Sequence, residues 1–462
     1  MMRSKAICLL GLALLGPCIT GYAERLTFPQ ALEKMKERNE ALTATQDDVE
    51  MRGLEQAAAR GLRYPRVELE ARHLMLNDPI RISVDPVPVS LTVQDDQFNQ
   101  GQLKASLPLY TGGRIEAAVR ASEARVNEAQ AEGRKTEEAL TTELAERYFG
   151  CCLVESNLEV QAFKTRTMEE HAYQARRLLE EGIIARVEYL NAKVALANAR
   201  QEHQSAARDL AIVREGLANS VVSEEEVYPA SPLFVLNDLE TREDFQAYVD
   251  TGHPVIDLLA SKESLAKQAV RAEKGANRPT VYLFGMHELF PNDLTMLDPE
   301  WAMGLGMECT LFDGFQSKNK TAAARVQVRK VTHLRQKIER DLKSLVVKRY
   351  EEMQKAREQY DTFEATIELA AENMRVRTCA FEEGFASSID VVDAALSHAR
   401  ALLGRYKAAY DFDLAFFQLL EASGQSTRCM DYLDRAVPVT APAFETLVSE
   451  TPAEDGPTEV TE

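Results

Sequence analysis

The chain has 462 residues, and its 22 glycines and 17 prolines gather in a few places instead of recurring regularly. Ala, Glu, Leu, Lys, Arg and Gln fill the long stretches between them, a composition typical of long helices. The formal net charge of −19 argues against nucleic acid as a partner, because a nucleic-acid-binding surface is normally basic.

The first 23 residues have the pattern of a secretory signal peptide. Arg3 and Lys5 precede an apolar run at residues 6–16, which is too short to span a bilayer as a helix. Small residues at and before Ala23 predict cleavage after that position, so we expect an exported protein. Lipidation of Cys18 is the less favoured alternative, because the proline before it fits such a site poorly.

The first elements expected after the signal are a helix and two strands. Thr27 and Gln30 have the spacing of a capping box, and a helical pattern follows to about Gly61 with a break near Asn39. Apolar and polar side chains alternate over residues 67–72 and again over 103–109, which predicts two strands. Residues 76–98, which include three prolines, are interpreted mostly as a long loop.

A very long helix is expected next. No proline lies between Gly113 and Gly182, and a continuous helix over that stretch would measure about 105 Å at 1.5 Å per residue. Its apolar residues have coiled-coil spacing, at Leu140, Leu144, Tyr148, Cys151 and Leu158. After Gly182 a second helix is expected to return as far as about Ser220.

The second half of the chain repeats the first. Glu383-Gly384 lies 202 residues after Glu181-Gly182, and the same offset relates the strand ends and the coiled-coil positions. The second half has its own pair of alternating strands, near residues 281–284 and 301–311, and its own returning helix, from about Ile389 to Leu420. A duplicated unit of this length is too long for a solenoid repeat or a propeller blade.

These patterns divide the chain into a signal peptide (1–23), a first repeat (24–220), an inter-repeat segment (221–250), a second repeat (251–424) and an irregular C-terminal segment with an acidic tail (425–462). The four strands have about the length of a tilted membrane strand, roughly 10 residues. In a soluble sandwich their apolar face would be the core, and in a membrane it would meet lipid. Four strands cannot close a barrel, so a membrane barrel would need several chains.

The order and spacing of three motifs resemble the TolC family of outer-membrane efflux proteins. The motifs are the strand-to-helix exits at residues 109–114 (LYTGGR) and 311–315 (LFDGF), and the helix turns at Gly182 and Gly384, the latter followed by IDVVDA at 389–394. The resemblance covers the chain from about residue 26 to residue 424.

This resemblance implies a mainly α fold with a membrane β-barrel, in which long antiparallel coiled-coil helices form a tunnel. Four strands from each chain of a homotrimer would make a 12-stranded barrel in outer-membrane lipid, and the tunnel would extend into the periplasm. The channel would export substrates with an inner-membrane pump and a periplasmic adaptor, in an efflux or type I secretion system. The family carries out no catalysis and needs no cofactor.

The resemblance also assigns roles to residues at the two helix turns. Glu188, Asp390 and Asp393 match acidic positions that narrow the periplasmic entrance in the family, although carboxylates at a helix start are favourable in any protein. Glu181, Gly182, Glu383 and Gly384 form the turns themselves, and we expect the two glutamates to influence which adaptor docks. Ala386 stands where the family often has a basic residue, so the closed state must rest on other contacts.

Gly112, Gly113 and Gly314 are expected to turn the backbone between the strands and the long helices. The sequence shows no nucleophile with a partnered base, no phosphate loop and no metal-ligand spacing. The alternative to a channel is a structural coiled-coil protein of the periplasm or cell surface, which would account for the helices but not for the strands. Drug, metal-ion and protein cargo are not distinguished by the sequence.

Overall fold

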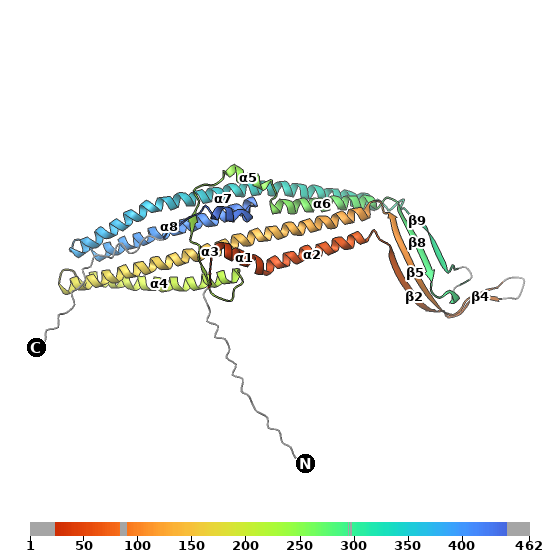
Figure 1. Cartoon of the computed structure of the whole chain (residues 1–462), viewed down its shortest axis with the longest axis horizontal. Coiled ribbons are helices and arrows are strands. Elements are labelled where there is room, and N and C mark those ends of the chain that lie inside the picture. The colour runs from red at the N-terminus through yellow and green to blue at the C-terminus, as the bar shows by residue number, and fades with distance from the viewer. Residues whose placement is uncertain (1–23, 84–89, 294, 296–297, 441–462) are drawn as a thin grey trace, which may run out of the picture.

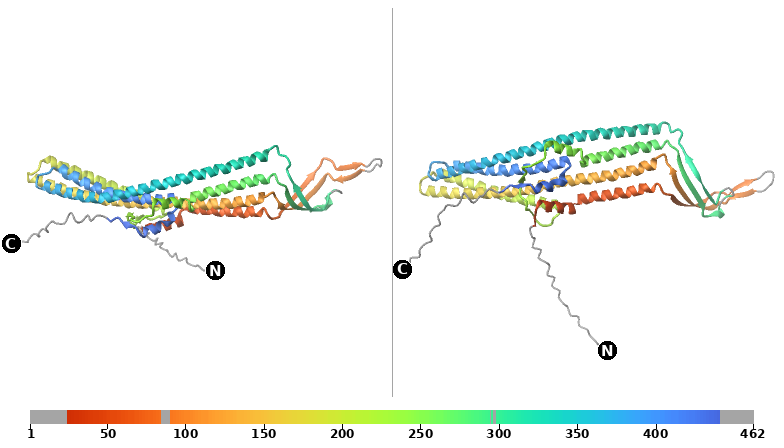
Figure 2. Two further views of the ribbon diagram at one scale, coloured as in Figure 1. Left: turned by 90° about the horizontal axis from the view of Figure 1, so that it is seen from above. Right: turned by 45° about the horizontal axis from the view of Figure 1, so that its top comes forward.

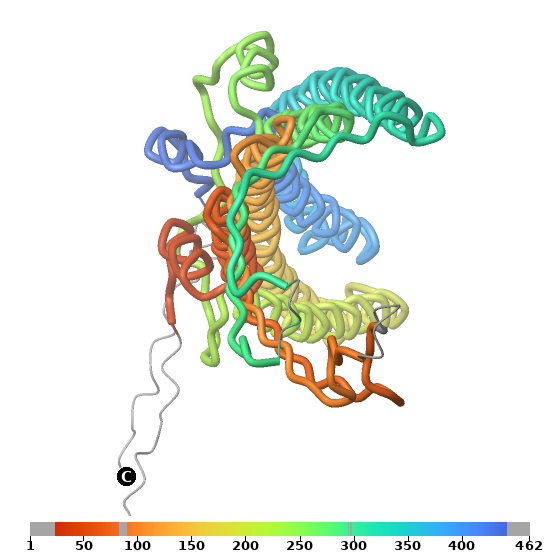
Figure 3. Tube along the Cα trace, turned by 90° about the vertical axis from the view of Figure 1, so that its right-hand side faces the viewer, coloured from red at the N-terminus to blue at the C-terminus, as the bar shows by residue number. Residues whose placement is uncertain are grey.

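The computed structural model describes residues 24–83, 90–293, 295 and 298–440. The predicted signal peptide and the acidic tail lie outside the described residues. The protein is long and narrow, with a four-stranded sheet at one end, two helical hairpins at the other, and rows of helix between them (Figure 1). Viewed along the long axis, the elements follow a curved path (Figure 3).

The first helices begin and end as the sequence predicts. Thr27 caps helix α1 (Phe28–Arg38). Its hydroxyl accepts a hydrogen bond from the backbone N–H of Gln30, and the side-chain oxygen of Gln30 accepts one from the backbone N–H of Thr27. Asn39 ends α1 and caps α2 (Glu40–Gly61), because its side-chain oxygen accepts from the N–H of Ala41 at 2.9 Å. The capping box and the break at Asn39 are both confirmed.

Both repeats contribute a hairpin to one antiparallel sheet of order β2-β5-β8-β9. The strands are β2 (Arg66–Met75), β5 (Gln97–Tyr110), β8 (Thr280–Glu288) and β9 (Trp301–Glu308). The pairing of β5 with β8 joins the two halves of the chain. The four predicted strands are therefore confirmed, although β5 begins several residues earlier than the alternation indicated.

The interpretation of residues 76–98 as mostly loop is wrong. Strands β3 (Ile80–Ser83) and β4 (Ser90–Gln94) form a separate antiparallel hairpin, which extends beyond the sheet (Figure 1). Ile82 pairs with Leu91, so an alternation of apolar residues does exist on both strands. This alternation spans only four or five residues on each strand. The prolines in the sequence between the two strands favour a loop, so the alternation was not recognised.

The sheet has one aliphatic face, and cross-strand pairs line it. Leu69 pairs with Leu103, and Leu283 pairs with both Leu107 and Leu305. Because paired residues point to the same side of an antiparallel sheet, these leucines share a face. That face is solvent-exposed in the single chain: the exposed fraction is 67% for both Leu69 and Leu305.

On the opposite face, aromatic rings of β8 lie over glycines of β9. A Cβ on Gly306 would lie 2.5 Å from the Tyr282 ring, and one on Gly304 would lie 3.0 Å from the Phe284 ring. Gly304 and Gly306 alternate with the apolar residues of β9, and their lack of a side chain makes room for these rings.

Two helices of 67 residues each, α3 (Arg114–Glu180) and α7 (Gln316–Glu382), run the length of the helical region. At 1.5 Å per residue each is about 100 Å long. Near the sheet they are flanked by α2 and by α6 (Pro254–Gly275), and toward the other end by α4 (Arg186–Ser220) and α8 (Ser388–Ser423) (Figures 1 and 2). Among the described residues, no helix combines the length and apolar character that crossing a membrane requires.

The hydrophobic core lies midway along the molecule, where the inter-repeat segment wraps the helices. Phe28, Phe149 and Phe417 form an aromatic cluster with ring centroids 5.0–5.7 Å apart. Tyr148 is fully buried beside them, and its hydroxyl donates to the Leu26 carbonyl at 2.7 Å. The predicted coiled-coil positions Leu144, Tyr148 and Cys151 are buried, and Leu140 and Leu158 pack partly buried against them.

Short elements complete this central region. Strand β1 (Glu24–Leu26) pairs with β6 (Val227–Pro229), and β7 (Phe234–Val235) pairs with β10 (Val437–Pro438). Helix α5 (Arg242–Val249) lies within the inter-repeat segment at residues 221–250. The remaining elements are η1 (Pro291–Asp293), η2 (Ser426–Arg428) and α9 (Cys429–Leu433).

Candidate functional site

The candidate site is the pair of tip turns, which we define as residues 181–185 between α3 and α4 and residues 383–387 between α7 and α8. Gly182 and Gly384 both have φ of +77°, a left-handed conformation that favours glycine. In each turn the next residue closes the helix end, since Ile183 donates to the Leu178 carbonyl and Phe385 to the Ala380 carbonyl. The two turns therefore have the same backbone design.

The two returning helices are capped differently. Ser387 caps α8 in a capping box with Asp390, whose carboxylate accepts from the Ser387 N–H at 3.0 Å and from its hydroxyl at 2.7 Å. At the equivalent position of the first turn stands Ala185, which has no side chain that could cap α4. Glu188, the counterpart of Asp390, is thus left without a capping serine in its own turn.

Glu188 instead binds across to the second hairpin. Its Oε2 accepts from the backbone N–H of Ser388 at 2.8 Å. The hydroxyl of Ser388, which is fully buried, lies 2.7 Å from Nε2 of His171 on α3. His171 also packs on the Phe381 ring, with centroids 4.7 Å apart. We call His171, Glu188 and Ser388 the inter-hairpin link, because together they join the first helical hairpin to the second.

Charge states at the tip follow from these contacts. Hydrogen bonds from the side chain and backbone of Ser387 lower the pKa of Asp390, and the nearby Arg377 guanidinium contributes further. Burial lowers the pKa of His171 to about 4. Asp390 is therefore anionic and His171 neutral at neutral pH. A neutral imidazole fits a buried site in which Nδ1 has no hydrogen-bond partner among the described residues.

The other predicted tip residues face solvent. Glu181, Glu383 and Asp393 are exposed, and Phe385 beside Gly384 has 87% of its surface exposed. Ala386 packs partly buried near Phe381. The structure thus brings Glu188 and the start of α8 together. Asp393 lies one turn further along α8, and its carboxylate makes no hydrogen bond or ion pair with the described residues.

Comparison with known proteins supplies the family. The family model for outer membrane efflux proteins matches residues 31–221 and 259–425, which is most of the chain. This chain belongs to the outer membrane efflux protein family. A comparison with curated proteins found no match.

Solved structures of similar fold agree with this assignment. A membrane protein from Pseudomonas aeruginosa superposes with a TM-score of 0.74 at 15% identity, covering 86% of this chain and 90% of that one. The outer membrane protein VceC from Vibrio cholerae gives 0.70 at 14% identity, covering 86% and 96%. The CmeC outer membrane channel of Campylobacter jejuni gives 0.71 at 14%, covering 86% and 86%. The predicted fold class is confirmed as mainly helical, with long paired helices and four sheet strands per chain, and the closed barrel stays a prediction.

In this outer membrane efflux protein the predicted glycine turns lie between the strands and the long helices. Gly112 and Gly113, with φ of +65° and +88°, connect β5 to α3. Gly314, with φ of +65°, lies between β9 and α7 and is followed by Phe315 at φ +66°. Asp313 supports that bend by accepting from the Ser317 N–H at 2.8 Å.

Sequence reasoning missed two members of the inter-hairpin link, His171 and Ser388. The serine could have been suspected, because two serines precede the acidic motif at the start of α8. The histidine gave no signal, since it lies on α3, 217 residues before Ser388 in the sequence.

Proposed function

We propose that this chain forms a homotrimeric channel that exports substrates across the outer membrane. Three four-stranded sheets would close one 12-stranded barrel, and the helices would form a tunnel that extends into the periplasm. An inner-membrane pump would drive export and a periplasmic adaptor would join the pump to the tunnel, as in tripartite efflux or type I secretion.

The open sheet is the observation that carries this proposal. Strands β2 and β9 each pair on one side only among the described residues, so both edges need a partner. An even number of antiparallel strands places β9 of one copy antiparallel to β2 of the next, so copies can continue the ladder. The exposed leucines would then meet lipid, which removes the cost of leaving them in water.

The tip turns would form the periplasmic entrance. Three copies would place Glu188, Asp390 and Asp393 around one axis, where rings of carboxylates favour cations and repel anions. The capping box and the inter-hairpin link fix the positions of Asp390 and Glu188, so these charges cannot simply rotate away. The inter-hairpin link would also supply the contact that holds the entrance closed in place of a basic residue at position 386.

The exposed part of the tip turns would meet the adaptor. Glu181 and Glu383 occupy equivalent positions before the two glycines, and both are exposed. Glu383→Val is expected to change binding of the cognate adaptor, because it removes a charge from the surface that docks.

Conductance in planar lipid bilayers tests the function. The purified protein is expected to form discrete channels that multivalent cations block. Asp393→Asn is expected to raise the conductance and weaken the block. Asp390→Asn should add to this effect, although it also weakens the capping box of α8. Asp361→Asn, an exposed change on α7 away from the tip turns, serves as the matched control. A protein that inserts but never conducts would support the structural coiled-coil alternative, and unchanged block in both tip variants would reject the entrance assignment.

A further inference from the structure

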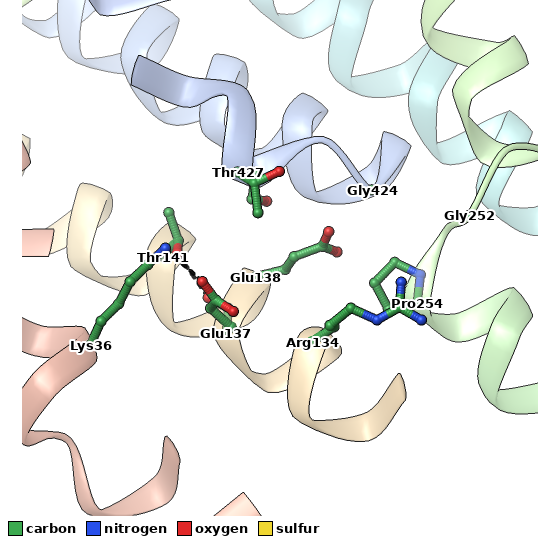
Figure 4. A pocket seen from close by; sticks show the side chains of 10 residues that line it. Lys36, Arg134, Glu137, Glu138, Thr141, Gly252, Pro254, Gly424 and Thr427 are labelled. Carbon is green, nitrogen blue, oxygen red and sulfur yellow. Dashed lines mark hydrogen bonds and ion pairs between the residues drawn. The ribbon is translucent and has the colours of Figure 1, made fainter. Parts of the chain in front are cut away.

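A polar cavity of about 230 Å³ lies in the central region, between α3 and the chain that follows α8. Helix α1 and the start of α6 also border it (Figure 4). The residues that line it come from distant parts of the sequence and include Lys36, Glu138 and Ser426. The cavity therefore brings polar groups of the two halves of the chain close to one another.

The charged groups that line this cavity are paired, with one exception. Lys36 binds Glu137 at 2.5 Å, and Arg134 binds Asp257 of α6 at 2.7 Å. Glu138 also lines the cavity, but its carboxyl makes no hydrogen bond or ion pair with the described residues. Both cations are thus already held by other carboxylates, and Glu138 is left without a counter-charge.

The carboxyl of Glu138 is buried in this unpaired state. Only 7% of the residue is exposed. Figure 4 shows its side chain extending from α3 into the cavity, toward the segment that follows α8. An ionised carboxylate is costly in such a place, whereas a protonated carboxyl is neutral and can donate a hydrogen bond. The position of Glu138 therefore favours the protonated form.

The wall formed by the chain after α8 disfavours a negative charge and offers an acceptor. Gly424 is the C-cap of α8, so the negative end of that helix dipole lies at this wall. Ser426 is 3% exposed, and its hydroxyl oxygen has no hydrogen-bond partner among the described residues. A protonated Glu138 can donate toward such an oxygen, directly or through a water molecule, and an ionised one cannot.

The charges around Glu138 act in the same direction as its burial. Burial is the main cause that raises the pKa of Glu138 to about 8, and the carboxylate of Glu421 in the last turn of α8 is the second. On α3 itself, Arg134 lowers this pKa and Glu137 raises it, both to a smaller extent. The carboxyl of Glu138 is therefore mostly protonated at neutral pH.

Two further titratable groups lie on elements next to the cavity. His253, the N-cap residue of α6, is buried, and burial lowers its pKa, so its imidazole is neutral at neutral pH. Arg428 of η2 is paired with Glu240 at 3.3 Å. Neither group supplies a free positive charge that would hold Glu138 in its ionised form.

We propose that Glu138 is a proton-controlled joint between α3 and the end of α8. With its proton, the carboxyl is neutral and binds across the cavity, so residues 424–428 stay against α3. Without the proton, an unpaired negative charge faces the end of α8. Residues 424–428 then separate from α3, so that water reaches the carboxylate.

This joint gives the two ends of α8 opposite responses to pH. The end at Gly424 is released as the pH rises and Glu138 loses its proton. The other end begins at Ser388 of the inter-hairpin link, where His171 gains a proton as the pH falls. Helix α8 is therefore held at both ends only between these two titrations.

The size of the effect follows from the proton released on opening. The pKa of Glu138 is higher in the closed state than its ordinary value of 4.5. The contribution of this group to the closed state is therefore complete below pH 4.5 and is lost as the pH rises through about 8. Between these values, release of one proton raises the population of the open state by up to about tenfold per pH unit.

Hydrogen exchange of residues 424–433 in the full-length protein, in detergent, tests the joint. Rates are measured from pH 6.5 to 9, above the titration of His253, and corrected for the intrinsic pH dependence. In the parent, exchange is expected to accelerate by up to about tenfold per pH unit and to level off above about pH 8. Glu138→Gln keeps a neutral side chain of similar size, so its exchange should change much less with pH.

Three further variants make the test specific. Glu421→Gln removes a charge that raises the pKa of Glu138, so its exchange should level off at a lower pH than in the parent. Asp413→Asn removes another buried carboxyl and should keep the pH dependence of the parent. Glu132→Gln removes an acid on α3 outside the cavity lining, where Glu132 pairs with Lys135, and should also behave as the parent does.

Two results would overturn the proposal. The first is exchange in the parent that does not change with pH. The second is the same pH dependence in the parent and in Glu138→Gln, which would assign the effect to other groups. Glu421 is less buried than Glu138. If Glu138→Gln fails to fold, an exchange curve of Glu421→Gln that coincides with that of the parent would therefore have the same meaning.

Discussion

Gly112 is the more crowded of the two glycines at the bend between β5 and α3. Gly112 has φ of +65°, and a Cβ at that position would lie 2.5 Å from the backbone oxygen of Gly275. Gly112→Ala is expected to destabilise the fold by about 2 kcal/mol or more, because a left-handed backbone costs about 1–2 kcal/mol with a Cβ present and the contact adds to this. The unfolding temperature in detergent measures the loss.

Gly133→Ala is the matched control for that substitution. A Cβ on Gly133, in the middle of α3, would meet only the Thr45 side chain at 3.5 Å, an ordinary contact. Alanine favours a helix over glycine by about 1 kcal/mol, so this variant should be as stable as the parent or more stable. Equal unfolding temperatures for the Gly112→Ala protein and the parent would show that the bend tolerates a side chain.

A buried carboxyl in the aromatic core predicts a pH dependence. Asp413 is fully buried, its Oδ2 accepts from the Phe234 N–H at 3.3 Å, and its Oδ1 has no partner among the described residues. Burial raises the pKa of Asp413 well above its ordinary value of 3.8. The pKa of Asp413 is therefore higher in the folded than in the unfolded state. The contribution of this group to stability is complete below pH 3.8 and is lost as the pH rises through the folded-state pKa.

Asp413→Asn removes this titration and keeps an oxygen to accept from Phe234. The unfolding temperature of the variant, relative to the parent, is expected to increase as the pH is raised from 5 to 8. Thermal scans of both proteins at several pH values provide the measurement. A difference that stays constant over that range would mean that Asp413 does not titrate between the folded and unfolded states.

At the scale of helices, the inter-hairpin link makes the tip sensitive to acid. Burial lowers the pKa of His171 to about 4, below the ordinary value of 6.5. Because the pKa is lower in the folded state, this group contributes to the stability of the folded tip. The contribution is complete above pH 6.5 and is lost as the pH falls toward 4. Protonation would place an unpaired charge among α3, α7 and α8 and weaken the contact with Ser388.

Hydrogen exchange of the first turn of α8 tests this contact. After correction for the intrinsic pH dependence, exchange at residues 388–391 is expected to accelerate as the pH falls from 6.5 to 4. His171→Gln should show fast exchange at both pH values, because the glutamine neither fills the site beside Phe381 nor titrates. His203→Gln, on α4 and outside the link, should behave as the parent does. Exchange that is independent of pH in the parent would exclude His171 as the sensitive group.

Elements set by local sequence signals could be predicted, and elements set by distant contacts could not. The capping box at Thr27, the break at Asn39 and the glycine turns at 182 and 384 depend on residues a few positions apart, and all are found at those positions. The β3–β4 hairpin was missed because its strands are too short for a periodic pattern. The link from Glu188 to Ser388 was missed because its partners lie 200 residues apart.

For the whole molecule, duplication explains the shape. The two repeats supply equal long helices and one strand hairpin each, and they meet side by side in the sheet and in the central core. One copy leaves the aliphatic sheet face exposed and both sheet edges unpaired among the described residues. An exposed apolar face and unpaired edges are features of a subunit whose sheet is completed by association with other copies. Such association is the central claim of the proposed function.

The mass of the protein purified from outer membranes in mild detergent tests that claim most directly. Light scattering, corrected for the bound detergent, gives the number of chains in each particle. The account predicts three, because three sheets of four strands close the proposed barrel. A particle of one or two chains, or recovery of the protein in the soluble periplasmic fraction without detergent, would contradict it.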